Sequence, residues 1–516
     1  MKTAFSYEAM PYPSKFFRQT NPDRLASVAT LFGMNPAAVE SCRFLELGCG
    51  NGSNLLTHAF NLPRARFVGV DLSENHIAFA KDAARELDIS NTEFHRLDVM
   101  EMSADEFGEF DFIVAHGLYS WIPQMVREKV LSLYRQMLAP EGVGYISYNA
   151  YPGGHQREMA RNILQFHTKN ISDPTEKVGG AISFLGFLTE NATETKIYRP
   201  ILQQELKRHF EHGTADIFHD DLAEVYQPFY FHEIAAQLEK NDLQFLSEAE
   251  IQAMSIYGFA PEVQKFLTSF DDVIEREQYL DFLRGRLFRQ TLVCRAEIQL
   301  NRAPVPSALD KFLLASSIQP HSENLDLTKN KAERFVGDKG FGIEIDHPLT
   351  KAALVRLGRI WGQSESFPEL LQAARQMLEE QNLPIEDWTT ETDTARAILF
   401  QICNSTDLIE FYLHKLPDAI ETSEKPKINK LARWQLRYAD NVSTLLNKDL
   451  KIDDQVSRQL LELLDGTHNR ADLLRGLTKF IKTSDEIDDK QEILDDLPDW
   501  LETSISGLAR IGMFVS

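Results

Sequence analysis

The segment Arg43–Gly52, with the sequence RFLELGCGNG, decides the fold of this protein. Its first half is mostly apolar, as in a buried strand, and it leads directly into Gly48-Cys49-Gly50-Asn51-Gly52. Glycine readily adopts the positive φ angles that a tight strand-to-helix turn requires, and without a Cβ atom it lets a ligand approach the backbone closely. The segment therefore predicts a strand, a ligand-binding turn and a helix, in that order.

Short apolar segments alternate with helix-period segments over residues 1–150, which is typical of βαβ units and a parallel sheet. The expected strands are Arg43–Leu47, Arg66–Asp71, Thr92–Leu97, Phe110–Ala115 and Val143–Tyr148. The expected helices are Asn54–Phe60, Glu74–Leu87 and Val126–Leu138, the last one ended by a turn at Ala139-Pro140-Glu141-Gly142.

Two later segments, Leu243–Ser247 and Gln290–Ile298, are expected to complete a seven-stranded sheet, with a helix over 230–241 before the first of them. Residues 152–228 would then form a helical insertion after the fifth strand, where a lid over a substrate would lie. Gly258–Arg289 would be a second, smaller insertion. The predicted class is α/β, with a Rossmann-like sheet.

The composition changes after residue 300, at the proline-containing segment NRAPVPSALD. Residues 301–420 predict a middle α+β domain, with helices near His347–Trp361 and Phe367–Glu379. Residues 421–516 contain a strand-like VSTLLNKDLKI followed by two helices around DGTHNRADLL, a winged-helix-like pattern. The acidic stretch 485–500 is expected to be a solvated helix face.

The net charge is −23, divided into −13 for residues 1–300 and −10 for residues 301–516. Nucleic-acid binding requires a basic surface, so nucleic acid is not an expected partner, whereas a lysine-rich substrate would be attracted. No stretch reaches the roughly 18–20 apolar residues of a membrane span, and the N-terminus lacks the apolar core of a signal peptide, so we expect a cytoplasmic protein. The four cysteines form no CxxC pair, so we expect no metal site.

Carboxylates follow the second and third expected strands. Asp71 is placed to accept hydrogen bonds from ribose hydroxyls and Asp98 to meet an adenine amino group, with Leu72 and Val99 on the two faces of the ring. Ser53 occupies the position of the third glycine of a dinucleotide-binding motif, and Glu46 suits a cationic ligand better than a pyrophosphate. The pattern favours S-adenosylmethionine over NAD.

The ordered run ELGCGNG, VGVDLS, LDV, FDFIVAHG and LAPEG resembles the class I S-adenosylmethionine-dependent methyltransferases. HGLYSWIP at 116–123, the segment 220–251 and YLDFLRGRLFRQTLVC at 279–294 are similar to a narrower group, which has a methyltransferase regulatory domain and includes the rickettsial protein-lysine methyltransferases that act on an outer-membrane protein. The resemblance implies a catalytic domain over 1–300, a regulatory-domain-like segment over 220–294 and a winged-helix-like C-terminal domain. The segment 12–22 resembles the family's N-terminal signature, which implies that Tyr12 closes over the cofactor, but the segment could equally be a packed N-terminal arm. The expected cofactor-binding residues are Tyr12, Glu46, Gly48, Cys49, Gly50, Gly52, Asp71, Leu72, Asp98, Val99 and His116.

Aromatic and polar residues follow the fourth and fifth expected strands, where substrates of α/β enzymes bind. Ring faces attract cations, so these loops predict a pocket for an amine, and His116 could accept its proton or only contact the cofactor. Trp121 could instead hold a helix end, His116 could be a polar residue at a strand end, and Tyr148 could face the core. The candidate catalytic residues are His116, Tyr119, Trp121, Tyr148, Asn149 and Tyr151.

The leading hypothesis is an enzyme that N-methylates lysine side chains of a protein, and the alternative is a methyltransferase with a small-molecule acceptor. A DNA-binding regulator is the third hypothesis, disfavoured by the −10 charge of residues 301–516. We expect the C-terminal domains to mediate homodimer formation or substrate docking.

Overall fold

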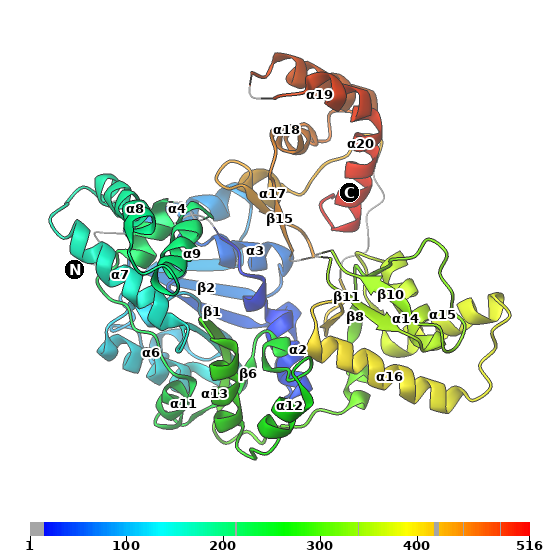
Figure 1. Ribbon diagram of the computed structural model, residues 1–516, viewed down its shortest axis with the longest axis horizontal. Helices are drawn as coiled ribbons and strands as arrows, with labels where there is room; N and C mark the ends of the chain where they lie inside the picture. Colours follow the sequence, from blue (N-terminus) through cyan, green and yellow to red (C-terminus); the bar gives the residue numbers. More distant parts are fainter. Residues whose placement is uncertain are drawn as a thin grey trace. The chain divides into compact units, whose positions relative to one another are not determined.

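The computed structural model describes residues 15–211, 214–338, 340–416, 423–446, 448–485 and 487–515 (Figure 1). These residues form two compact units. The first comprises Lys15, 34–250 and 256–300, and the second comprises 16–33, 251–255 and the described residues from 301 onward.

The first unit is built around a seven-stranded sheet in the order β3-β2-β1-β4-β5-β7-β6. The first five strands run parallel, and β7 is antiparallel to both of its neighbours, which confirms the predicted Rossmann-like sheet. The chain order reverses between β1 and β4, and the crevice at such a reversal is where open α/β sheets bind ligands. The strands are β1 (Arg43–Leu47), β2 (Arg66–Asp71), β3 (Thr92–Arg96), β4 (Phe110–Ala115), β5 (Leu138–Asn149), β6 (Leu243–Glu248) and β7 (Phe288–Arg295).

Four strands differ from their expected bounds, β3 and β6 by one residue at their ends and β5 and β7 by more. β5 begins at Leu138, because the predicted turn at 139–142 is instead an irregular start of the strand, with a register shift against β4. Gly142 permits this shift, since a Cβ there would lie 2.9 Å from the backbone nitrogen of Ala139. β7 ends at Arg295, because the Gln244 side chain binds the carbonyl oxygens of Arg295, Ala296 and Ile298.

One apolar core joins the sheet to the helices that cover it. Leu45, Ile113 and Ile146 from three central strands pack with Leu133 of α6 and Ile234 of α11. The helices between and beside the strands of this unit are α3 (Ser53–Asn61), α4 (Glu74–Glu86), α5 (Ala104–Phe107), α6 (Gln124–Met137) and α11 (Phe231–Glu239).

Residues 152–228 are helical, as predicted, and have an apolar cluster of their own that includes Leu164, Leu185 and Leu202. Their elements are α7 (Gly154–Thr168), α8 (Pro174–Asn191), α9 (Tyr198–Glu211), α10 (Thr214–Asp216) and the π-helical turn η4 (Ile217–Asp221). The second insertion contains α12 (Pro261–Leu267) and α13 (Val273–Arg284).

The second unit begins with a segment that the sequence placed in the catalytic domain. The helix α2 (Pro22–Leu31) belongs here because Asp23 accepts hydrogen bonds from the backbone amides of Leu413 and His414, and Arg18 pairs with Glu410. The unit continues with the short strands β8 (Leu313–Ala315), β9 (Gln319–Pro320), β10 (Glu333–Val336), β11 (Gly342–Ile345), β12 (Glu365–Ser366) and β13 (Glu410–Tyr412). Its helices before residue 416 are α14 (Pro348–Arg359), α15 (Phe367–Glu380) and α16 (Trp388–Ser405).

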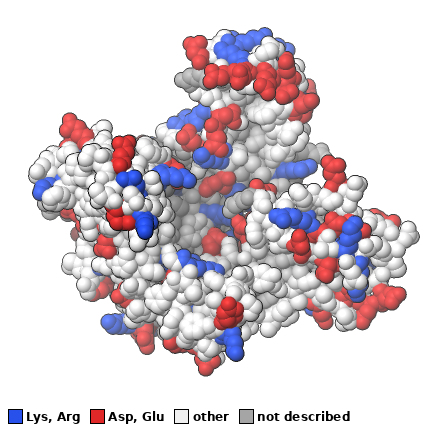
Figure 2. Space-filling model, viewed as in Figure 1, with Lys and Arg blue, Asp and Glu red and all other residues white. Residues whose placement is uncertain are grey.

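The C-terminal part of this unit has its own apolar core, which includes Leu460, Leu477 and Leu501. The expected strand over VSTLLNKDLKI is a hairpin of two short strands, because Thr444 turns the chain by accepting from the Leu446 and Lys448 amides. Acidic side chains lie beside a group of basic ones at the top of Figure 2, where Figure 1 draws α19. The elements are α17 (Lys430–Gln435), β14 (Asn441–Ser443), β15 (Asp449–Lys451), α18 (Gln455–Leu463), α19 (Arg470–Thr483) and α20 (Lys490–Arg510). Among the described residues, no helix combines the length and apolarity that crossing a membrane requires.

Candidate cofactor and acceptor site

The glycine turn after β1 has the left-handed backbone that its sequence predicts. Gly48, Gly50 and Gly52 have φ angles of 72°, 53° and 77°. A Cβ on Gly52 would lie 2.8 Å from the Cβ of Ala80, so this glycine lets α3 and α4 pack closely. A Cβ on Gly50 would meet nothing within 4 Å. The turn is therefore open at Gly50, where a ligand can approach the backbone.

The carboxylate of Asp71 faces this turn from the end of β2. It accepts hydrogen bonds from the backbone amides of Gly50 and Ser73, both over 2.9 Å. The imidazole Nδ1 of His76 lies 3.8 Å from the same carboxylate. The Asp71 side chain is 17% exposed, so it can also reach a ligand at the turn.

Glu46, in β1, carries a buried oxygen that fits a cationic ligand. One carboxylate oxygen accepts from the Asn54 side chain over 2.8 Å, and the other is buried with no hydrogen-bond partner in the part of the chain that the structure describes. Burial, together with the nearby charge of Asp71, raises the pKa of Glu46 to about 8. A cation beside this oxygen would supply the missing partner and compensate the buried charge.

The other expected cofactor residues surround the same turn or lie outside the described residues. Asp98, just after β3, caps a turn by accepting from the Met100 amide over 2.9 Å. Leu72 is 47% exposed, whereas Val99 is half-buried against the core. The thiol of Cys49 is buried, and burial raises its pKa well above the usual range, so it packs rather than reacts. Tyr12 lies outside the described residues.

His116 follows β4 and is held by the neighbouring strand. Its Nδ1 lies 2.9 Å from the Tyr145 hydroxyl and 3.4 Å from the Ser147 hydroxyl. Burial and the nearby charge of Lys15 lower the pKa of His116 to about 3. An imidazole with such a pKa is a weak base, which favours a contact role over proton acceptance.

Two of the expected acceptor residues lie in the hydrophobic core instead of a pocket wall. Tyr119 is 1% exposed, packs against Phe229 and donates to Gln237 over 2.8 Å. Tyr148 is equally buried, and its hydroxyl lies 3.1 Å from the Thr291 hydroxyl. Neither ring has a free face for a substrate, because β5 turns Tyr148 inward and the short helix after β4 turns Tyr119 inward.

Trp121, Asn149 and Tyr151 have contacts near the first turns of α7. The ring of Trp121 lies 5.1 Å from that of Tyr226, and the Asn149 carboxamide oxygen accepts from Arg157 over 3.2 Å. Tyr151 stacks on His155 at 4.0 Å and donates to Glu158. These three residues remain candidates for the acceptor site.

Sequence reasoning missed Arg157, Arg161 and Tyr226. Both guanidinium groups lie over the Trp121 ring, at 5.8 and 5.4 Å from its centroid. The two arginines are one turn apart on α7 and so share a face, which was a usable signal directly after the fifth strand. Tyr226 had no such signal, because only the folded insertion brings it to Trp121.

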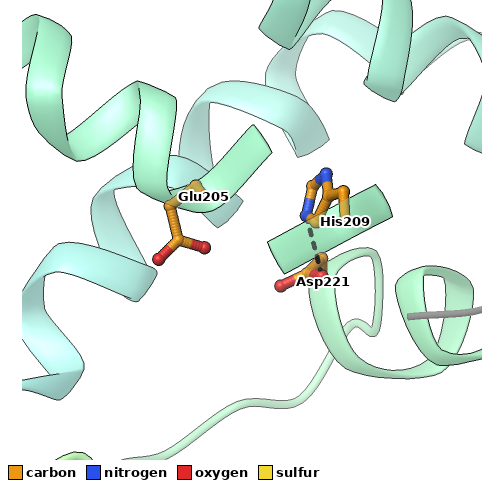
Figure 3. A group of neighbouring side chains, drawn as sticks. All are labelled: Glu205, His209 and Asp221. Carbon is orange, nitrogen blue, oxygen red and sulfur yellow. Dashed lines mark hydrogen bonds and ion pairs between the residues drawn. The ribbon is translucent and has the colours of Figure 1, made fainter. Parts of the chain in front are cut away.

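Glu205, His209 and Asp221 offer ligand atoms within 4.8 Å of one another, the spacing of a metal site (Figure 3). Arg208 donates to both carboxylates, over 2.8 and 2.7 Å, and His209 Nε2 lies 3.0 Å from Asp221. Although burial raises it, the His209 hydrogen bond and the charges of Arg157 and Arg208 hold the pKa of Asp221 below its usual range. An arginine thus already supplies the positive charge that a metal ion would bring, and we assign no metal to this cluster.

Three family models match the chain. Residues 45–143 match a methyltransferase domain, and residues 214–295 match a predicted methyltransferase regulatory domain. Residues 424–513 match the C-terminal winged helix domain of PKMT. The first match contains the glycine turn, Asp71 and Asp98, and the second contains Asp221 and Tyr226.

Relatives and a solved structure extend the similarity over most of the chain. An uncharacterised protein of Rickettsia prowazekii is 28% identical over 508 residues, which are 95% of this chain and 90% of the relative. A second uncharacterised protein of that organism is 31% identical over 242 residues, 47% of this chain and 96% of the relative. The structure of PKMT2 from Rickettsia typhi in complex with AdoHcy is 27% identical, with a TM-score of 0.84, and the match covers 98% of this chain and all of that one.

Proposed function

Because this chain belongs to the class I S-adenosylmethionine-dependent methyltransferases that carry a methyltransferase regulatory domain, we propose that it N-methylates lysine side chains of a protein substrate. A solved structure with a similar fold over its whole length is that of a PKMT bound to AdoHcy. The acidic charge of −23 would attract a lysine-bearing partner.

The observation that supports this function most directly is the unpartnered oxygen of Glu46 beside the open turn at Gly50. In our proposal the Glu46 carboxylate holds the cofactor's ammonium group, and Asp71 accepts from its ribose hydroxyls. Asp98, Leu72 and Val99 hold the adenine. The cofactor, when bound, supplies a methyl group on a sulfonium, which requires no metal.

The chain's own residues must orient the amine and let it lose its proton. Trp121 follows β4, which lies next to β1 in the sheet, and Asn149 and Tyr151 lie at the carboxyl end of β5, the next strand. Leu118 connects the two sites, since its side chain would lie 3.2 Å from a Cβ on Gly48. His116 is a weak base, so we propose that the amine gives its proton to solvent before transfer.

The test is incubation of the purified protein with S-adenosylmethionine carrying a labelled methyl group and with lysates of cells that lack it. We expect label in protein, recovered as methyl-lysine after acid hydrolysis, and much less label with the Asp71→Ala variant. Label found only in small molecules would contradict the protein acceptor while leaving the methyltransferase activity intact.

We also propose that residues 152–228 form a lid and that the chain has domains over 1–300, 301–420 and 421–516. The C-terminal domains are proposed to mediate homodimer formation or substrate docking, and the proposed location is the cytoplasm. Size measurement of the full chain in solution tests the homodimer, which a monomer at micromolar concentration would contradict.

A further inference from the structure

A buried arginine and a tyrosine lie together beside Trp121. Arg161, on α7, is 2% exposed, and its guanidinium carbon lies 4.2 Å from the ring centroid of Tyr226 and 5.4 Å from that of Trp121. The rings of Trp121 and Tyr226 are 5.1 Å apart. The three side chains form a compact stack, which we call the Arg161 stack.

The polar atoms of this stack are only partly satisfied. Nη2 of Arg161 donates to the Ala223 carbonyl over 2.8 Å, but Nη1 is buried with no hydrogen-bond partner among the described residues. The Tyr226 hydroxyl is also buried, and no described residue forms a hydrogen bond with it. A buried donor without an acceptor is destabilising, so both atoms favour a ligand that brings acceptors.

Arg157 lies one turn earlier on α7, and its guanidinium group has the hydrogen-bond partners that a buried arginine requires. It donates to Asn149, Asp220 and Asp221, two of which are carboxylates. Arg161 has no carboxylate within ion-pair distance in the described part of the chain, and burial lowers its pKa to about 10. The charge of Arg161 is therefore under-compensated, whereas that of Arg157 is not.

We infer that Arg161 and Tyr226 bind a carboxylate of the methyl acceptor, placed close to the amine that is methylated. This inference rests on the proposed function, because it assigns the acceptor to the stack beside Trp121. A guanidinium nitrogen and a phenol hydroxyl are both donors, which matches the acceptor-only chemistry of an ionised carboxylate. The net negative charge of the protein repels free anions. The carboxylate must therefore belong to a substrate whose positively charged lysine is attracted to the protein. The substrate class is therefore a lysine with an aspartate or glutamate nearby.

The test uses peptides cut around lysines that take up label in the lysate experiment. Each neighbouring acidic residue is replaced in turn by its amide, Glu by Gln or Asp by Asn, and KM and kcat are measured for each pair. We expect the wild type to show a KM about tenfold lower for one acidic peptide than for its amide partner. Arg161→Gln should abolish this preference by raising only the KM of the acidic peptide, Tyr226→Phe should reduce it, and Arg161→Lys should keep part of it.

Two controls separate recognition from folding. Arg85→Gln, on α4 with a side chain 78% exposed, should behave as the wild type. The affinity for S-adenosylhomocysteine should be equal in all four variants. If Arg161→Gln no longer binds S-adenosylhomocysteine, the wild type is compared with Tyr226→Phe instead. A wild-type enzyme that methylates every acidic and amide peptide equally would overturn the inference, as would an acid preference that survives Arg161→Gln. If no protein takes up label at all, the proposed function fails first and the inference fails with it.

Discussion

The backbone amide of Gly50 donates a hydrogen bond to the Asp71 carboxylate, with 2.9 Å between the nitrogen and Oδ2. This bond joins the turn after β1 to the end of β2, two places that the sequence separates by a full helix. The other oxygen of Asp71 accepts from the Ser73 amide, which fixes the carboxylate from both sides. The carboxylate is therefore held in place before any ligand arrives, which lowers the entropic cost of binding.

Asp71→Ala should weaken S-adenosylhomocysteine binding by about 1–3 kcal/mol, because a charge-assisted partner of the ribose and the anchor of the Gly50 turn are lost together. Isothermal titration calorimetry measures the change. Asp82→Ala, on the exposed face of α4, serves as the control and should bind normally. Equal affinities of the Asp71 variant and the wild type would contradict the assigned cradle.

Cofactor binding at pH 7 should release roughly one proton from Glu46. Its pKa of about 8 means that the carboxyl is mostly protonated in the free protein, and an ammonium beside it lowers that pKa. Calorimetry in buffers of different ionisation enthalpy measures the released proton, and Glu46→Gln should abolish the release. A binding enthalpy that does not depend on the buffer would show that Glu46 does not meet the cation.

The same group gives a pH dependence of stability in the free protein. Its folded pKa lies above the ordinary value of 4.5, so the protonated form is favoured by folding. The contribution is fully present below pH 4.5 and is lost as the pH rises towards and past 8. The melting temperature of the wild type should therefore fall relative to Glu46→Gln between these pH values. A constant difference between the two proteins would contradict the raised pKa.

Gly50→Ala and Gly52→Ala should have different effects although both glycines have positive φ. Gly52→Ala forces a Cβ to within 2.8 Å of Ala80 and 2.9 Å of Phe94, so we expect the larger loss of unfolding free energy, about 2 kcal/mol or more. Gly50→Ala meets no atom and should cost only about 1–2 kcal/mol of backbone strain, but it should weaken cofactor binding because its methyl group occupies the open side of the turn. Denaturant titration and calorimetry on both variants test this contrast, and a reversed order would refute it.

The variants Tyr119→Phe and Trp121→Phe distinguish a residue of the hydrophobic core from a residue of the acceptor site. Tyr119→Phe removes a buried hydrogen bond to Gln237 and should cost about 1–2 kcal/mol of stability with kcat and KM unchanged. Trp121→Phe weakens the stack with Tyr226 and should raise the acceptor KM severalfold with little effect on cofactor affinity. Peptide methylation kinetics and thermal unfolding distinguish them. A changed kcat or KM in the Tyr119→Phe variant would show that Tyr119 belongs to the acceptor site.

The sequence predicted most of the strands and the glycine turn after β1, because both depend on neighbouring residues. Apolar runs, glycines and the carboxylates at the end of β2 (Asp71) and just after β3 (Asp98) are local features, and a parallel sheet then brings the strand ends together. Prediction failed at Ala139–Gly142, where Pro and Gly indicated a turn but pairing with β4 made a bulged strand. It failed again at Tyr119, whose inward direction is set by Gln237 and Phe229 from a distant segment.

The chain by itself determined a Rossmann-like sheet and the glycine turn after β1, because the residues that define them lie next to one another in sequence. Only the tertiary structure decided which aromatic residues face the core, and that Arg161 and Tyr226 meet beside Trp121. The physical reason is burial: whether a polar atom has a partner depends on what packs around it, and the packing neighbours here come from α7, the end of the helical insertion and the loop after β4.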